Sequence, residues 1–397
     1  MSVSASPRDV NEIIQKDCVS PKTYTSADDM IKIEFNADRI DLSTCQVNVE
    51  IHASNATCTL PSTCGIASVF SRAVFNLGGA DVTVINRFGD VMAAELLARE
   101  TFASKTGLGI SRIYGQAAAL GNGIGEKHTY TLPLYFAPFS EGIRLNMAQF
   151  KQPAYIELYL AQDDVALYDT AGSGTYSITR AWISYHRYKK GEGLRLSPGD
   201  TINVTGVTST TKTVQISDSI PFPRVVSNAH SITVLMNVDV SGYDATSDHK
   251  FGSNIAAMTK AHVTLNGNDH PRNHLGQRDF QYEAYRLAYD NQYPDGDIMK
   301  GEFIDQAAFQ SGWSGMLTIP LRSLEAPRMR EGLGMTLMGT MMSSEDRFVY
   351  EQSATSGANV ILIVKYGQIW VYNDGGSISD YHAGSRFRQT TFSEPNY

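Results

Sequence analysis

The chain has 397 residues, which is enough for two hydrophobic cores of ordinary domain size rather than one. Hydrophobic residues make up 42% of it and charged residues 19%, a globular composition that excludes an intrinsically disordered chain. The formal net charge of -8 argues against a surface that neutralises phosphates, so we expect no direct nucleic-acid binding.

The N-terminal region and the cysteines indicate whether the chain is secreted and whether its thiols are reduced. Residues 1–17 have no cationic segment followed by an apolar run, so no secretory signal is expected, and no run of 18 apolar residues is present to span a bilayer. The four cysteines, Cys18, Cys45, Cys58 and Cys64, fit no zinc-ligand spacing. We expect reduced thiols, with a Cys58–Cys64 disulfide as the alternative.

Strand patterns dominate the first half of the chain. A short helix is predicted over residues 10–15, with Val10, Ile13 and Ile14 on one side. A longer helix should start at Asp90 and stop at the glycines at 107 and 109. Alternation of apolar and polar residues predicts strands over 31–35, 47–51, 82–84, 155–160 and 176–182.

The second half continues the same pattern. One helix is predicted over 278–293, where Phe280, Ala284 and Leu287 share a face before Pro294 ends it. Because no helices regularly connect consecutive strands, we expect antiparallel sheets and an all-β fold class. Strands are predicted over 212–216, 232–236, 262–265, 360–364 and 369–372.

An internal repeat at an offset of roughly 180–190 residues suggests a duplicated domain. Five segments recur in the same order, and the segments at 80–85 and 261–266 each precede a predicted helix. The pairs are 31–35 with 212–216, 46–51 with 231–236, 80–85 with 261–266, 132–134 with 319–321, and 176–188 with 360–372. The two halves are therefore predicted to share one fold, with a hinge near residues 189–193.

Each half needs about eight strands in roughly 180 residues, with one inserted helix and long loops. An immunoglobulin-like unit would need only about 100 residues and no helix in mid-domain. We therefore predict two tandem eight-stranded jelly rolls with short inserted helices. The boundaries are an N-terminal arm over 1–29, a first roll over 30–192, a second roll over 193–380 and a C-terminal tail over 381–397.

Three segments carry a resemblance to a known family. They are residues 70–86 running into the helix at Asp90, the Leu-Pro-Leu strand and following loop and strand over 131–161, and residues 262–274 before an aromatic-rich helix. Together they resemble the double jelly-roll major capsid proteins of tailless icosahedral DNA viruses, the lineage that includes adenovirus hexon. The resemblance spans about residues 30–375. The loops are far too short for hexon towers, so the compact members are the better match.

The resemblance implies a structural protein of the virion and not an enzyme. Three chains would form a pseudo-hexagonal homotrimer that tiles the shell beside neighbouring capsomers and other capsid proteins such as a vertex penton. Tyr282, Tyr285 and Tyr289 are candidates for the subunit interface, or they cover their own barrel. The N-terminal arm, through the residues Val10, Ile13 and Ile14, would dock under a neighbour or touch an internal viral membrane, or else fold against its own barrel.

No catalytic, cofactor or metal site is expected. His270 and His274 have the spacing of a helical metal pair, but Pro271 between them opposes a helix. The glycine cluster at 121–125 lacks the strand and helix of a phosphate-binding loop. The alternative function is a receptor- or carbohydrate-binding β-sandwich such as a spike, against which Trp182 and Trp370 argue because both fall within predicted strands. A two-domain glycosidase is a third reading.

Overall fold

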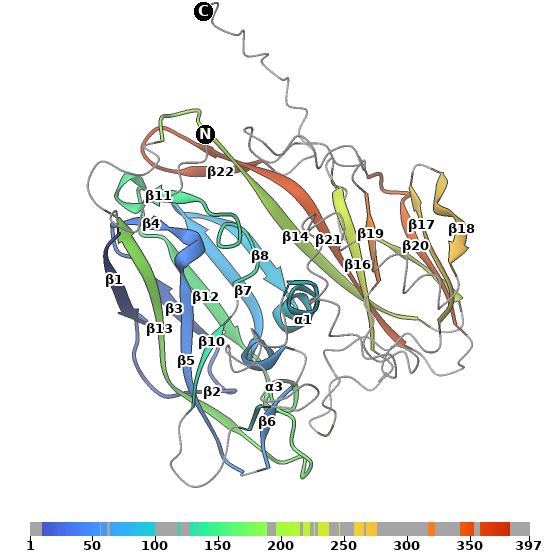
Figure 1. Ribbon diagram of the computed structural model, residues 1–397, viewed down its shortest axis with the longest axis horizontal. Helices are drawn as coiled ribbons and strands as arrows, with labels where there is room; N and C mark the ends of the chain where they lie inside the picture. Colours follow the sequence, from blue (N-terminus) through green and yellow to red (C-terminus); the bar gives the residue numbers. More distant parts are fainter. Residues whose placement is uncertain are drawn as a thin grey trace, which may run out of the picture.

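The computed structural model describes most of the chain in separate stretches. These are residues 10–55, 57–61, 64–99, 118–119, 128–132, 134–188, 196–214, 217–222, 226, 229–237, 246, 258–265, 267–275, 317–321, 342–352 and 358–381. In Figure 1 two sheets of the N-terminal half lie on the left and two sheets of the C-terminal half on the right, with one helix between them.

The first half forms two antiparallel sheets that face each other. One sheet has the order β10-β5-β13-β4-β11, with β1 and β2 paired to the other edge of β13, and the second has the order β3-β12-β7-β8. The bounds are β1 Val10–Asp17, β2 Tyr24–Thr25, β3 Met30–Glu34, β4 Arg39–Asp41, β5 Gln46–Ala53, β7 Phe70–Leu77, β8 Ala80–Asn86, β10 His128–Leu132, β11 Arg144–Asn146, β12 Tyr155–Leu160 and β13 Tyr176–Tyr188.

Short elements connect these strands. The helix α1, Phe88–Arg99, follows β8, and its Asp90 carboxylate accepts a 2.7 Å bond from Arg87 in the first turn. Asp90 therefore lies inside the helix that it was predicted to open. The other pieces are α3 Asp163–Ala166, the 3-10 turns η2 Leu42–Thr44, η3 Gly65–Val69 and η4 Met147–Gln149, and the two-stranded sheet of β6 Thr59–Leu60 and β9 Ala118–Ala119.

The second half repeats the arrangement. One sheet has the order β14-β21-β16-β19, with β22 paired to β21, and the other has the order β15-β20-β17-β18. The bounds are β14 Thr201–Val214, β15 Ser217–Pro221, β16 Ala229–Asn237, β17 Met258–Leu265, β18 Asn268–Leu275, β19 Leu317–Pro320, β20 Arg347–Gln352, β21 Ala358–Tyr372 and β22 Ile378–Tyr381.

The strand orders of the two halves are the same. Eight strands of the first half, β1, β3, β5, β7, β8, β10, β12 and β13, correspond in chain order to β14 through β21 of the second. In both halves the first, eighth, third and sixth strands form one sheet, and the second, seventh, fourth and fifth form the other. Two four-stranded sheets with this connectivity make a jelly roll, so the predicted fold class is confirmed.

Three details of the sequence prediction are wrong. Residues 10–15 form the strand β1 and not a helix, because β1 hydrogen-bonds to β13 along residues 182–188 and gains more from that ladder than from one isolated helical turn. Residues 31–34, on β3, correspond to β15 and not to 212–216, of which the described residues 212–214 end β14. Residues 261–265 of the segment 261–266 lie on β17, the counterpart of β7 and not of β8.

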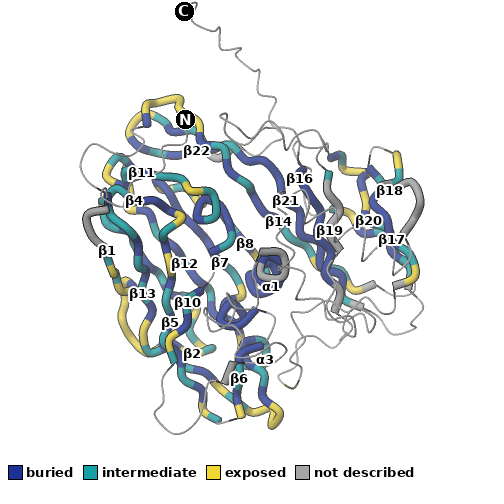
Figure 2. Tube along the Cα trace, viewed as in Figure 1, coloured by how far each residue is buried: buried dark blue, intermediate teal, exposed yellow. Residues whose placement is uncertain are grey.

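Alternation places the apolar residues of the first roll inside. Along β12 the side chains of Ile156, Leu158 and Leu160 are buried, while Tyr155 and Glu157 point outward. Phe75 and Phe139, 5.0 Å apart and edge to face, form the centre of this core. Figure 2 shows the buried residues concentrated inside the first roll and along the strands that face α1. The third predicted helix, over 278–293, and the hinge at 189–193 lie outside the described residues.

Candidate functional site

The junction between the two rolls is a buried contact between distant parts of the described chain. It forms where the outer face of the β14-β21-β16 sheet meets β8 and α1 of the first roll, which Figure 1 shows side by side. Along β21 the residues alternate between two cores. Val360, Leu362 and Val364 pack inside the second roll, whereas Ile361 and Ile363 join the apolar cluster of the first.

This double burial explains the sequence of β21. A strand that is apolar on one face only alternates, as β13 does, but a strand buried on both faces becomes a continuous apolar run. Residues 360–364 are such a run. At the same cluster Leu235 of β16 and Val204 of β14 add apolar area, and Trp370 is fully buried there. The second roll therefore uses one sheet for two hydrophobic contacts.

A buried ion pair crosses the junction. Lys365 of β21 extends toward α1 and bonds to the Glu95 carboxylate, and their side chains are only 11% and 3% exposed. Removing two charges from water costs several kcal/mol each, so such a pair stabilises little relative to apolar residues of the same shape. Breaking it costs much more, because one charge would remain buried alone. The pair therefore favours one angle between the rolls over others.

Hydrogen bonds that involve backbone atoms fix how the two rolls are aligned along the junction. The Gln368 side-chain amide donates to the Val82 carbonyl at 3.0 Å, in a fully buried position. The Ser209 hydroxyl donates to the Asn86 carbonyl at 3.0 Å. The Thr205 N–H donates to the Glu141 carboxylate at 2.6 Å. Because these bonds need particular positions on both rolls, sliding one roll by a residue would break them.

At one end of the junction the two rolls are joined by hydrogen bonds to backbone carbonyl groups. The Lys151 N–H donates to the Gly376 carbonyl at 2.9 Å, and the Tyr372 hydroxyl donates to the Gln149 carbonyl at 2.9 Å. Gly376 has φ +80°, and a Cβ there would overlap the Gln149 carbonyl and lie 2.7 Å from the Lys151 nitrogen. Glycine is required at 376 both by its conformation and by this close approach.

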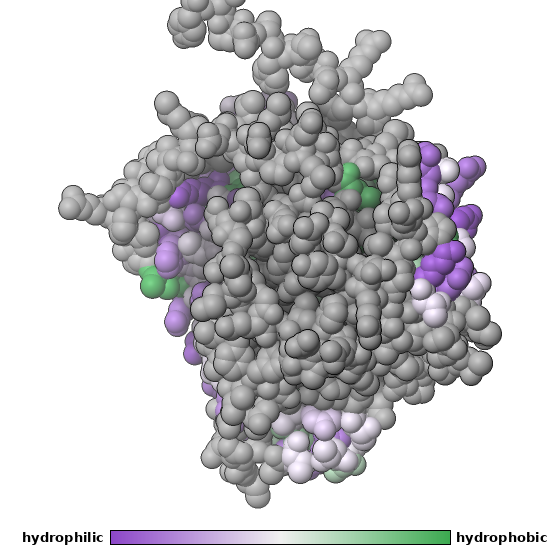
Figure 3. Space-filling model, turned by 45° about the vertical axis from the view of Figure 1, so that its right-hand side comes forward, coloured by the Kyte–Doolittle hydropathy of each residue, from purple (hydrophilic) through white to green (hydrophobic). Residues whose placement is uncertain are grey.

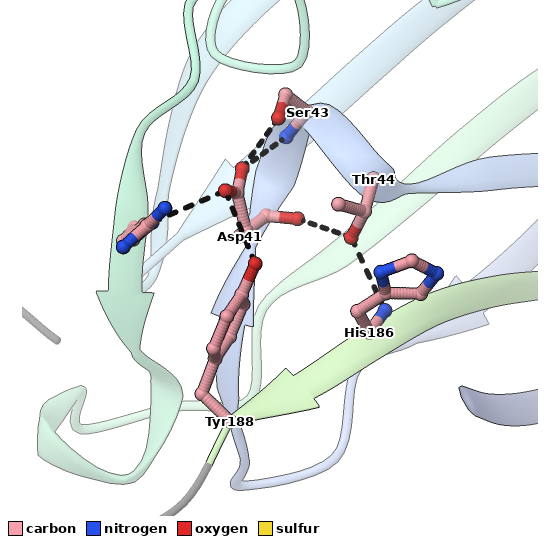
Figure 4. A network of polar contacts seen from close by, with 6 residues as sticks. Asp41, Ser43, Thr44, His186 and Tyr188 are labelled. Atoms are coloured by element: carbon pink, nitrogen blue, oxygen red, sulfur yellow. Dashed lines mark hydrogen bonds and ion pairs between the residues drawn. The ribbon is translucent and has the colours of Figure 1, made fainter. Parts of the chain in front are cut away.

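A second polar network holds the end of β13, where the chain leaves the first roll (Figure 4). The Asp41 carboxylate accepts hydrogen bonds from Ser43, from Arg144 at 3.2 Å and from the Tyr188 hydroxyl at 3.5 Å. The Thr44 hydroxyl donates to the Asp41 carbonyl at 2.7 Å and accepts from the His186 N–H at 3.1 Å. This network ties β4, β11 and β13 together.

The predicted interface residues of the N-terminus lie on β1. Ile13 is 65% exposed, and Ile14 packs partly against the first-roll core, so the two point to opposite faces. Ile13 and Ile14 therefore do not share the face that the sequence predicted for them and Val10. Tyr282, Tyr285 and Tyr289 lie outside the described residues. Ile13 and Val19 are the two large hydrophobic side chains exposed in the described part of the chain.

The outer face that contains Ile13 is otherwise polar, with one aromatic residue near its centre. Half-buried Trp182 of β13 has the Arg180 guanidinium 4.5 Å from its ring centroid, and Arg180 bonds to Asp17 at 2.7 Å. Sequence analysis named Ile13 of this surface as an interface candidate but missed Trp182 with Arg180 and the Lys365–Glu95 pair. The signal for both was the contrast between the alternating residues 176–188 and the apolar run 360–364.

Metal and membrane features are few in the described residues. His262 lies 3.5 Å from the Asp269 carboxylate, and no group of three or more His, Cys, Asp and Glu suited to a metal occurs in those stretches. His270 and His274 lie on β18, a strand. The four cysteines are buried and none of them forms a disulfide. Burial raises the pKa of Cys45 well above its ordinary value, and the Asp41 charge adds to the effect. No helix in the described part is long and apolar enough to cross a membrane.

No protein-family model and no curated protein matches the sequence. Solved structures do match over nearly the whole chain. VP54 of PBCV-1, fitted into a reconstruction of the virophage Sputnik, has a TM-score of 0.62 at 11% identity and covers 96% of this chain and 99% of its own. The protein folds as a double jelly roll. A Sputnik virophage chain gives 0.60 at 9% identity, covering 99% and 93%, and the mavirus major capsid protein gives 0.55 at 9%, covering 96% and 92%.

These likenesses extend across both halves of the double jelly roll and leave no large part of either partner unmatched. At such low identity they establish the fold. The coverage also agrees with the short loops noted in the sequence. If this chain had long tower loops, the alignment with these structures would leave a large part of it unmatched.

Proposed function

We propose that this protein is the major capsid protein of an icosahedral DNA virus and that three copies form a pseudo-hexagonal block of its shell. The observation that carries the proposal is a pair of rolls with the same strand order, joined by a buried junction. Such a chain lets threefold symmetry present six similar rolls, and closed, repeated contacts then tile a flat facet.

The similar structures support the same reading. The mavirus protein is named a major capsid protein, and another similar structure is a quasi-atomic model of the PBCV-1 virus capsid. A place in the virion, contacts with neighbouring capsomers and with a vertex protein, and a structural rather than catalytic role follow from the proposal. The surface drawn in Figure 3 is mostly hydrophilic where its residues are described, and hydrophobic residues form only small patches there.

The mass of the purified protein in solution tests the proposal. Light scattering behind a sizing column should give a trimer of about 130 kDa, three times the chain mass of 43.5 kDa, because a shell block of six rolls needs three chains. A stable monomer at all concentrations would contradict the proposal and would favour a receptor- or carbohydrate-binding protein instead.

A further inference from the structure

We propose that the outer face of the β1-β13-β5 sheet is the docking surface for a second copy of this chain, which presents the β18 edge of its second roll. The proposal rests on the proposed trimer and goes further, because it assigns the face. The starting observation is that the equivalent face of the second roll, β14-β21-β16, is already occupied within the chain by the β8 side of the first roll.

The strand registers define which positions are equivalent. Leu132 of β10 pairs with Val47 of β5, and Ile319 of β19 pairs with Ile232 of β16, so Val47 corresponds to Ile232. One residue further along, Asn48 pairs with Trp182 and Thr233 pairs with Ile363. Trp182 therefore occupies the place of Ile363. The match of 176–188 with 360–372 would place it at Tyr366, so the registers correct that match by three residues.

The neighbouring pairs extend the correspondence. Gln46 pairs with Ser184, and Ser231 pairs with Lys365, so Ser184 occupies the place of the lysine that binds α1. On the edge strand, Gln15 pairs with Ser184 as Val207 pairs with Lys365. Continuing along both edge strands, Ile13 takes the place of Thr205 and Asp17 the place of Ser209.

Every one of these second-roll positions touches the first roll. Ile363 and Val207 are buried in the shared apolar cluster, and Lys365 is paired with Glu95. Thr205 and Ser209 donate hydrogen bonds to Glu141 and to the Asn86 carbonyl.

In the described part of the chain, the corresponding positions of the first roll have no such cover. Ile13 is 65% exposed, Gln15 and Asp17 are exposed, and Trp182 is half-buried. Tryptophan and arginine are the residue types that contribute most to protein interfaces, and Trp182 lies stacked with Arg180 on this face.

The complementary side is found on the second roll. β18 is the fifth strand there, as β8 is in the first roll. Near the start of each of these strands, an aspartate carboxylate accepts a hydrogen bond from a side chain of the preceding strand. The Asn76 amide donates to Asp81 at 2.8 Å in one roll, and the Thr264 hydroxyl donates to Asp269 at 2.9 Å in the other.

The partner that covers the β1-β13-β5 face can be inferred by repeating the contact between the two rolls of one chain. Each roll has one accepting face and one presenting edge, and the contact inside the chain uses one of each. Within the described residues, one accepting face, β1-β13-β5, and one presenting edge, β18, are left over. A head-to-tail contact that joins them between chains closes into a ring when the rotations from roll to roll add up to a full turn, and a ring of six rolls contains three chains. A second copy therefore fits this face, with no additional kind of interface required.

Substitution at Trp182 tests the assignment. Trp182→Glu places a charge at the centre of the proposed contact and should reduce the trimer to monomer at concentrations where the wild type is a trimer. The matched control is Tyr155→Glu, which places the same charge on the outer face of the β3-β12-β7-β8 sheet, where Tyr155 is also half-buried. The control should remain trimeric. Circular dichroism and melting establish that both variants are folded.

The outcomes separate this inference from the proposed function. A wild type that stays monomeric refutes both. A trimeric wild type with a trimeric Trp182→Glu variant refutes the assigned face alone. Ile13→Asp keeps the test decisive if Trp182→Glu unfolds, because the Ile13 side chain is mostly exposed in the single chain, and it should weaken the trimer in the same way.

A photo-crosslinking amino acid at position 13 gives a direct readout. Mass spectrometry should find the crosslinks in peptides of the second roll that contain or adjoin β18, and only in the trimer fraction. Crosslinks confined to the first roll, or an equal yield in the monomer fraction, would overturn the assigned face.

Discussion

The Lys365–Glu95 pair at the junction allows a quantitative prediction. Glu95→Gln keeps the shape of the side chain and removes its charge, which leaves the Lys365 ammonium buried beside a neutral group. Opposite charges about 4 Å apart attract by about 4 kcal/mol at an effective dielectric constant of about 20. Truncating one member of a buried pair costs about 3–5 kcal/mol in measured cases. We therefore expect Glu95→Gln to lose about 3 kcal/mol of unfolding free energy.

Urea unfolding followed by tryptophan fluorescence measures this loss, because Trp370 is fully buried in the same apolar cluster and reports on the junction. The matched control is Glu351→Gln, which breaks the Lys260–Glu351 pair on the second roll, where the side chains are 37% and 45% exposed at 3.5 Å. Exposed pairs contribute about 0.2–1 kcal/mol, so the control should change little.

A double-mutant cycle completes the test. Glu95→Gln combined with Lys365→Met removes both charges, and most of the lost stability should return because no charge is left buried. If Glu95→Gln were as stable as the control, or if the double variant were no better than the single one, the junction would not depend on a buried charge pair.

Four further predictions address other parts of the chain. Gly376→Ala should lose about 1–3 kcal/mol from strain at φ +80° and from overlap with Gln149; Gly375→Ala, at φ +78° with nothing within 4 Å, should lose less in the same melts, and equal losses would contradict the close approach. Burial alone would raise the pKa of Asp169, but hydrogen bonds from Thr57 and two backbone N–H groups outweigh it and lower the pKa. The charged carboxylate therefore stabilises the fold above pH 3.8, and this contribution to stability is lost as the pH falls below that value. The melting-temperature gap between wild type and Asp169→Asn should accordingly narrow in acid, and a gap independent of pH would refute this. Tyr285→Asp should impair trimer assembly more than folding, as judged by sizing chromatography beside circular dichroism; unaltered trimers would remove Tyr285 from the interface. The net charge of -8 predicts no appreciable DNA affinity at physiological salt, which micromolar filter binding with a steep salt dependence would contradict.

The strand content and the duplication could be predicted from the sequence because alternation is a local property. Residues 155–160 alternate between core and solvent, and the structure places them on β12 with that orientation. The matching of repeats was less reliable, since neighbouring strands of a jelly roll have similar patterns. This is why residues 31–35 were paired with the end of β14 rather than with β15.

The junction could not be predicted because it depends on residues far apart in the chain. Adjacent Ile13 and Ile14 resemble part of a helical face, and only pairing with β13 sends them to opposite sides. Lys365 follows an apolar run, and the carboxylate that pairs with it, Glu95, lies on α1 of the other roll, 270 residues away in sequence. Trp182 looks like an ordinary strand residue until the register with Asn48 shows which face it occupies.

The central claim is that three of these chains form one block of six rolls, and electron microscopy of the purified protein tests it most directly. Class averages should show a pseudo-hexagonal outline with threefold symmetry, in which six rolls surround the axis. Isolated two-roll particles, or oligomers with twofold symmetry, would contradict the account.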